Sequence, residues 1–118
     1  MLERHPNLKI LAVQGGGYLA SYSGRIDHAW GARSDSQGSL PHPPTTYLKR
    51  LYFDSVVFTP HQLQELVRLY GAEHILMGTD YRFDMADYDP VGHVCGAGLD
   101  AAATAGICGG NAGRLLGW

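Results

Sequence analysis

The sequence has little cysteine, little charge and no long apolar run, and each shortage excludes a class of protein. Two cysteines, Cys95 and Cys108, occur in 118 residues. They are too few for a disulfide framework, so free thiols in a reducing compartment are expected. Charged residues make up 17% of the chain and the net charge is −2. With no block of like charges, this composition argues against a nucleic-acid partner or a membrane-surface partner.

No apolar stretch approaches the roughly 18 residues that a membrane-spanning helix needs. The first residues, MLERHPNLK, also lack the apolar segment of a signal peptide. A cytoplasmic protein is therefore expected. The length is that of one domain, residues 1–118. Residues 1–6 have the pattern of the last turn of a helix that Pro6 ends, which predicts a chain that lacks an earlier part.

Several motifs of known chemistry are missing. The glycine-rich segment is neither a dinucleotide fingerprint nor a phosphate loop, and no serine-nucleophile motif occurs. No HxH or HExxH pattern is formed, so the chain has no self-sufficient zinc set. His93, Cys95 and Cys108 leave open a site for a soft metal, although free cysteines are the simpler interpretation. The six histidines are His5, His28, His42, His61, His74 and His93.

Three short apolar runs alternate with segments of helical periodicity. We expect strands at 8–13, 51–58 and 74–77, and helices at 18–33, 60–70, 99–107 and 111–116. One helical turn is expected at 47–50, and polar loops at 34–46 and 82–98. Because helices join consecutive strands, the strands should be parallel, and the crossover connections should be right-handed. The pattern predicts an α/β fold with three parallel strands and crossover helices.

The expected helix at 60–70 has the clearest signals. Thr59 and Pro60 stand where an N-cap and a first helical residue are preferred, and Gly71 follows as a stop. Its predicted buried stripe is Leu63, Leu66, Val67 and Tyr70. A second stripe is predicted for 18–33, formed by Leu19, Tyr22, Ile26, Ala29 and Trp30.

Polar residues follow the strands, where folds of this kind place their chemistry. Gln14 and three glycines follow the first strand, and Asp80 follows the third. Asp80 is the first candidate for a functional residue, with a cap of the next turn as its alternative. Asp54 lies within the second strand, as a buried partner for an arginine or an edge feature, and a structural role is favoured. Arg25 is placed either to bind a carboxylate or to lie in solvent.

Three segments then show these motifs in a familiar order: LKILAVQGGGYLASYSGRIDHAWGAR, YLKRLYFDSVVFTPHQLQELVRLYGAEHILMGTDYRFDM and ICGGNAGRLLGW. They resemble the C-terminal part of the amidohydrolase-related metal-dependent hydrolases and decarboxylases, in the branch similar to aminocarboxymuconate semialdehyde decarboxylase. The resemblance implies a partial (β/α)8 TIM barrel, to which this chain contributes strands six to eight with their helices. A C-terminal fragment of such an enzyme is expected.

The resemblance also implies a site. Asp80 falls on the family's metal-binding aspartate, and Arg25 on an arginine that in some relatives reaches a substrate carboxylate across a dimer interface. Gln14 stands where relatives have a histidine, and Arg82 where they commonly have proline. An amide cannot titrate as that histidine does, but it keeps a donor and an acceptor for orienting a substrate. The family's HxH pair on strand one and its metal-binding histidine on strand five have no counterpart in this sequence.

The expected function follows from this resemblance. The complete enzyme would use zinc or manganese, which this chain alone should not bind stably. It would act on a small-molecule carboxylate, with decarboxylation favoured over hydrolysis, and the chain alone should be inactive. A homo-oligomer or a missing N-terminal half is expected. The alternatives are a non-catalytic half-barrel that binds itself or a partner, and one chain of a split enzyme.

Overall fold

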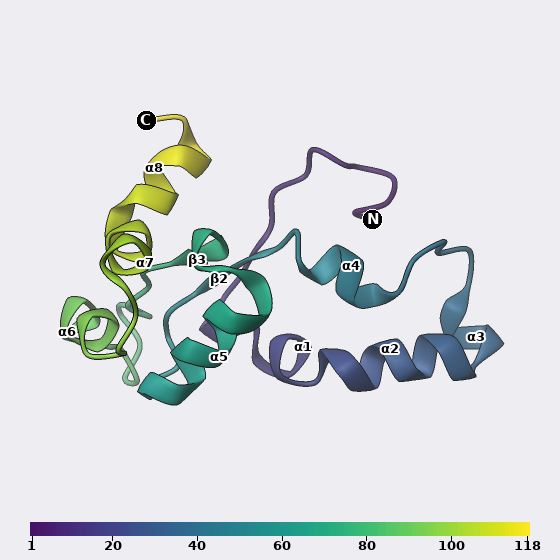
Figure 1. Ribbon diagram of the computed structural model, residues 1–118, viewed down its shortest axis with the longest axis horizontal. Coiled ribbons are helices and arrows are strands. Elements are labelled where there is room, and N and C mark those ends of the chain that lie inside the picture. The colour runs from purple at the N-terminus through teal and green to yellow at the C-terminus, as the bar shows by residue number, and fades with distance from the viewer.

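A computed structural model describes residues 1–118 as an alternation of strands and helices (Figure 1). The three strands are β1 (Leu11–Ala12), β2 (Tyr52–Asp54) and β3 (Ile75–Leu76). The α-helices are α1 (Gly17–Ser21), α2 (Ser23–Ala32), α3 (Ser34–Gln37), α4 (Pro44–Leu48), α5 (Pro60–Tyr70), α6 (Pro90–Cys95), α7 (Ala101–Ala105) and α8 (Asn111–Leu116). Short helical turns lie at η1 (Gln14–Gly16), η2 (Ala72–His74) and η3 (Gly106–Gly110).

The strands form one parallel sheet in the order β1-β2-β3, as the alternation of elements predicts. Leu11 pairs with Tyr52, and Phe53 pairs with Ile75. The strands are shorter than the expected runs at 8–13, 51–58 and 74–77. Only Phe53 of the central strand is paired on both sides.

Five expected ranges differ from the structure. The helix at 18–33 is interrupted at Tyr22, whose φ and ψ of −116° and 27° leave the helical region. The loop at 34–46 contains α3 and most of α4, which begins at Pro44 and replaces the single turn expected at 47–50. The loop at 82–98 contains α6, because Asp89 caps the helix and Pro90 starts it. In place of the helix expected at 99–107, the structure has the shorter α7, which is followed directly by the π-helical turn η3.

The core lies where α5, α6 and η3 pack with the sheet. Leu63 and Leu66 of α5 are buried, as expected, whereas Val67 is half-buried. At the centre, Phe53 of β2 is fully buried and its ring packs against that of Tyr70 at 4.4 Å. Thr59 occupies the N-cap position of α5, as expected, but its hydroxyl donates to the side chain of Gln62 and accepts no hydrogen bond from the helix backbone. This core holds the carboxyl end of the sheet in place.

The first three helices form an arm that extends to one side of the sheet, while α6, α7 and α8 gather on the other side (Figure 1). Leu19 and Tyr22, expected in a buried stripe, are exposed, and α2 has no fully buried residue. The radius of gyration is 15.2 Å, against about 13.5 Å for a compact domain of this length. No helix has the length and apolarity that a membrane crossing requires. The arm accounts for the elongated shape.

Candidate functional site

The carboxyl edge of the sheet is organised by the buried carboxylate of Asp54, which ends β2. One oxygen accepts a hydrogen bond from the backbone N–H of Gln14 at 2.8 Å. The other accepts from Gly15 at 2.8 Å and from Val56 at 3.1 Å. No arginine pairs with Asp54, so one alternative offered by the sequence is wrong and the structural role holds. The carboxylate fixes the loop after β1 to the end of β2.

Two glycines allow the neighbouring strand ends to approach this carboxylate. A Cβ added to Gly78, just after β3, would lie 2.9 Å from the Cβ of Asp54. A Cβ added to Gly16 would lie 2.6 Å from the ring of Phe53, and Gly16 has a φ of +75°. Side chains at these positions would separate the loops from β2. Ser55 adds a further link, because its hydroxyl accepts from the N–H of Gly78 at 3.2 Å.

Three residues other than glycine adopt left-handed backbone geometry, and each follows a different strand. They are Gln14 (φ +54°), Phe58 (φ +63°) and Asp80 (φ +55°). Such geometry costs roughly 1–3 kcal/mol per residue and is concentrated at functional sites in proteins. Two of the three are residues that the sequence selects as candidates. The strain therefore coincides with the edge where chemistry is expected.

Asp80 lies two residues beyond Gly78, at the start of a compact turn. Its carbonyl accepts from Phe83 N–H at 3.0 Å, and the carbonyl of Thr79 accepts from Asp87 N–H at 2.8 Å. The residue is half-buried, and no protein group donates a hydrogen bond to its carboxylate. The carboxylate therefore keeps its acceptor capacity for a ligand.

Gln14 lines a cavity of about 300 Å³ between the loop after β1, the segment after β2 and one side of α5. Its backbone is held by Asp54, while the residue as a whole is exposed. Asp80 does not line this cavity, so the two candidates share an edge of the sheet but not a pocket. The other lining residues are Gly15, Gly17, Ala20, Ser21, Val56, Val57, Phe58, Gln62, Glu65, Leu66 and Leu69.

Arg25 lies apart from both, on the exposed side of α2. It borders a different hollow of about 270 Å³, with aromatic walls from Tyr18 and Trp30. No carboxylate pairs with its guanidinium. The described fold thus brings Gln14 and Asp80 to one edge and leaves Arg25 on the arm.

The next question is which side chains of the structure could hold a metal. No group of three or more histidine, cysteine, aspartate or glutamate side chains gathers anywhere in the structure. The combination of His93, Cys95 and Cys108, left open by the sequence, is therefore wrong. Asp80 can offer one carboxylate to a metal, and a divalent metal needs more protein ligands than that.

Sequence reasoning placed Asp54 within a strand but missed what its carboxylate does. Asp54 and Ser55 together bind the loops after both neighbouring strands. The available signal was the pair itself, a carboxylate and a hydroxyl within an apolar run, directly before the carboxyl end of a strand. Both residues are buried, and buried polar side chains need partners.

The family model described as amidohydrolase matches residues 1–118. A 2-amino-3-carboxymuconate-6-semialdehyde decarboxylase of Dictyostelium discoideum is 35% identical over 91 residues, which are 76% of this chain and 25% of that protein. The enzyme of the same name from Caenorhabditis elegans is 37% identical over 90 residues, 75% of this chain and 22% of that protein. The chain thus spans about a quarter of the length of these relatives.

A solved structure supports the fold. The 5-carboxyvanillate decarboxylase of Novosphingobium aromaticivorans, complexed with manganese and 4-hydroxy-3-methoxy-5-nitrobenzoic acid, matches with a TM-score of 0.86 and 19% identity. The match covers 99% of this chain and 35% of that one. The three-stranded sheet is therefore a partial barrel. The chain belongs to the amidohydrolase family, in its decarboxylase-like branch.

Proposed function

We propose that this chain forms the C-terminal part of a metal-dependent decarboxylase that acts on a carboxylate-bearing small molecule. The observation that carries the proposal is the position of Asp80. Its carboxylate has no protein partner and follows the last strand of the sheet, in a chain that matches the family over its whole length. Related proteins named as decarboxylases favour this reaction over hydrolysis.

In this proposal, Asp80 is one metal ligand and also holds the proton that replaces the departing carboxylate. The other ligands come from residues outside this chain. The metal is zinc or manganese, and its chemistry when bound is that of a Lewis acid. Because those ligands lie outside it, we infer that the chain alone is inactive.

The two other candidates have binding roles. Gln14 donates and accepts hydrogen bonds, so it orients the substrate without transferring a proton. Arg25 binds the substrate carboxylate, and its place on the arm, away from Asp80, fits a contact with the site of a second copy of the chain. Both roles need an assembly larger than the chain alone.

The test is to mix the purified chain with a second chain that carries the remaining strands of the barrel, and to add Mn²⁺ or Zn²⁺. We expect release of carbon dioxide from 5-carboxyvanillate or 2-amino-3-carboxymuconate semialdehyde only in the mixture. Asp80→Asn should abolish the activity. Asp84→Asn, which changes an exposed carboxylate of the same loop, should preserve it.

Two results would contradict the proposal. The first is a stable, metal-loaded complex of the two chains that releases no carbon dioxide from either compound. The second is equal activity of the Asp80→Asn variant and the parent. Activity of the chain without its partner would contradict the inference that it is inactive alone.

A second candidate function is supported by the exposed apolar surface. The total accessible surface is 7475 Å², whereas a compact monomer of 12.8 kDa has about 6,300 Å². Val13, after β1, and Tyr22, on the arm, are more than half exposed. A half-barrel that associates with itself would cover this surface without catalysis. Stable dimers that form without the second chain and exclude it on mixing would favour this alternative.

A further inference from the structure

The two cysteines lie on elements that pack against each other. Cys95 is the last residue of α6 and is exposed, whereas Cys108 lies within η3 and packs partly buried against the core. Helix α6 and η3 are in direct contact. The chain has no other cysteine, so any bridge within one molecule must join these two.

The two thiols differ in exposure. Burial, together with the adjacent thiol of Cys95, raises the pKa of the Cys108 thiol. The Cys108 thiol therefore loses its proton less readily than an ordinary cysteine, while Cys95 is open to reagents from solvent. This difference sets an order of reaction, in which the exposed sulfur reacts first.

We propose that Cys95 and Cys108 form a dithiol modification site, which a small-molecule disulfide such as oxidised glutathione converts to an intramolecular bridge between α6 and η3. The thiolate of Cys95 attacks the reagent, forms a mixed disulfide and releases one reduced thiol. The thiolate of Cys108 then attacks the sulfur of Cys95 and releases the second. Two protons pass from the protein to the two released thiols, and the reagent is reduced as the cysteines are oxidised.

The bridge would close a second tie around the segment that contains Asp80. The first tie already exists: the N–H of Met77, at the end of β3, donates to the carbonyl of Ile107 at 3.0 Å. The segment after Met77 therefore leaves the core beside Ile107, and α6 brings the chain back into contact with η3. That this tie would matter for metal binding by Asp80 rests on the proposed function. Formation of the bridge itself does not.

The test is incubation of the reduced chain with oxidised glutathione, followed by alkylation and mass spectrometry. Trypsin leaves both cysteines in one peptide, residues 83–114, but cleavage before Asp100 separates them. We expect a linked pair of fragments that reduction releases. The bridge should form at least about tenfold faster in native buffer than in concentrated urea, because the packing of α6 on η3 raises the effective concentration of one thiol beside the other.

Cys95→Ser and Cys108→Ser are the matched controls, each with a circular dichroism spectrum to check folding. Neither can form the linked fragments, and Cys95→Ser should be labelled by glutathione more slowly than Cys108→Ser. Equal rates of bridging in native buffer and urea would overturn the proposal. So would a parent chain that forms only mixed disulfides or bridges between molecules. No activity is measured, so failure here is distinct from failure of the proposed function.

Discussion

The two sides of the sheet differ in how much they bury. The segment from α5 to η3 contributes most of the residues that are almost completely buried, including Leu63, Ile75 and Ile107. The arm from α1 to α3 contributes one buried residue, Ala20, although it has Leu19, Tyr22 and Trp30 to offer. Both are amphipathic regions of one chain. The comparison teaches that the first has its packing partners within the chain, while the second leaves apolar side chains such as Leu19 and Tyr22 exposed.

The largest expected effect comes from breaking the packed side. Phe53→Ala removes the ring at the centre of the core, where the side chain is fully buried against Tyr70. We expect a loss of about 3–5 kcal/mol in the free energy of unfolding, measured by urea denaturation. Phe83→Ala, at a ring that is 68% exposed, is the control and should change it by less than about 0.5 kcal/mol. Equal losses would contradict the asymmetry.

The next effect concerns the carboxylate that joins the loops to the sheet. Asp54→Ala leaves the amides of Gln14, Gly15 and Val56 without their acceptor. We expect a loss of about 1–3 kcal/mol and faster hydrogen exchange at these amides. Asp84→Ala, in an exposed loop position, should leave exchange at the same amides unchanged. Unaltered exchange in Asp54→Ala would show that other contacts hold the loop.

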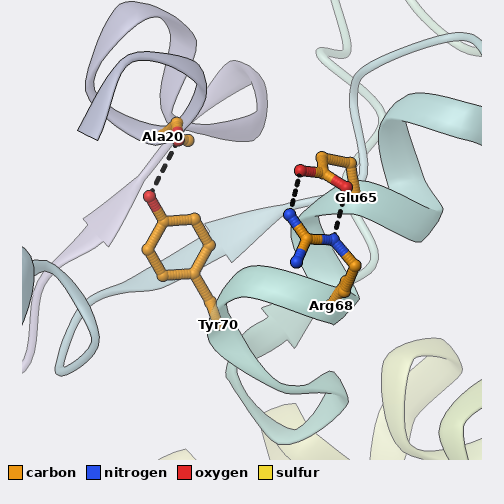
Figure 2. A network of polar contacts seen from close by, with 4 residues as sticks. All are labelled: Ala20, Glu65, Arg68 and Tyr70. Atoms are coloured by element: carbon orange, nitrogen blue, oxygen red, sulfur yellow. Dashed lines mark hydrogen bonds and ion pairs between the residues drawn. The ribbon is translucent and has the colours of Figure 1, made fainter. Parts of the chain in front are cut away.

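One buried hydrogen bond links the two sides, as Figure 2 shows. The hydroxyl of Tyr70 on α5 donates to the carbonyl of Ala20 in α1 at 2.9 Å. Tyr70→Phe should lower the free energy of unfolding by about 1 kcal/mol and increase hydrogen exchange in α1 more than in α5. Equal increases in the two helices would mean that the arm and the core unfold as one unit.

The same bond predicts a dependence on alkaline pH. Burial raises the pKa of Tyr70 above its ordinary range, because the phenolate is poorly solvated there and cannot donate. The contribution of Tyr70 is therefore complete below about pH 10 and is lost as the pH rises through the raised pKa. The difference in unfolding free energy between the parent and Tyr70→Phe should shrink over that range. A constant difference would contradict this assignment.

The smallest effect is expected at the exposed ion pair of Glu65 and Arg68, also drawn in Figure 2. The two side chains meet at 2.6 Å, and Arg68 lowers the pKa of the Glu65 carboxyl. Solvent and salt screen such a pair. Glu65→Gln should therefore shift the urea midpoint by less than Tyr70→Phe does, and 1 M NaCl should remove the difference. A larger shift than that of Tyr70→Phe would contradict the ranking.

The sequence predicted the alternation of elements and the packed side well, and the arm poorly. Helix α5 follows its stripe because Leu63, Leu66 and Tyr70 find partners on the same chain. The stripe of Leu19 and Tyr22 has the right spacing, but no element of the chain covers these side chains, so periodicity alone gave a wrong burial. Helix α6 lies in a segment expected to be a loop, because Pro90 ends a helix when it stands inside one, whereas with Asp89 before it the proline begins a helix.

The candidate site was predictable in position but not in organisation. Asp80 and Gln14 were selected because they follow strands, and the parallel sheet brings them to one edge. The hydrogen bonds of Asp54 join segments about 40 residues apart. Such pairing depends on the three-dimensional approach of two loops, which local spacing does not encode.

We propose above all that Asp80 is one ligand of a metal site whose other ligands come from residues outside this chain. Elemental analysis of the purified chain, with its mass measured in solution, tests this most directly. We expect far less than one zinc or manganese per chain, and the same metal content in Asp80→Asn. One metal per chain, lost in Asp80→Asn and retained in Asp84→Asn, would contradict it.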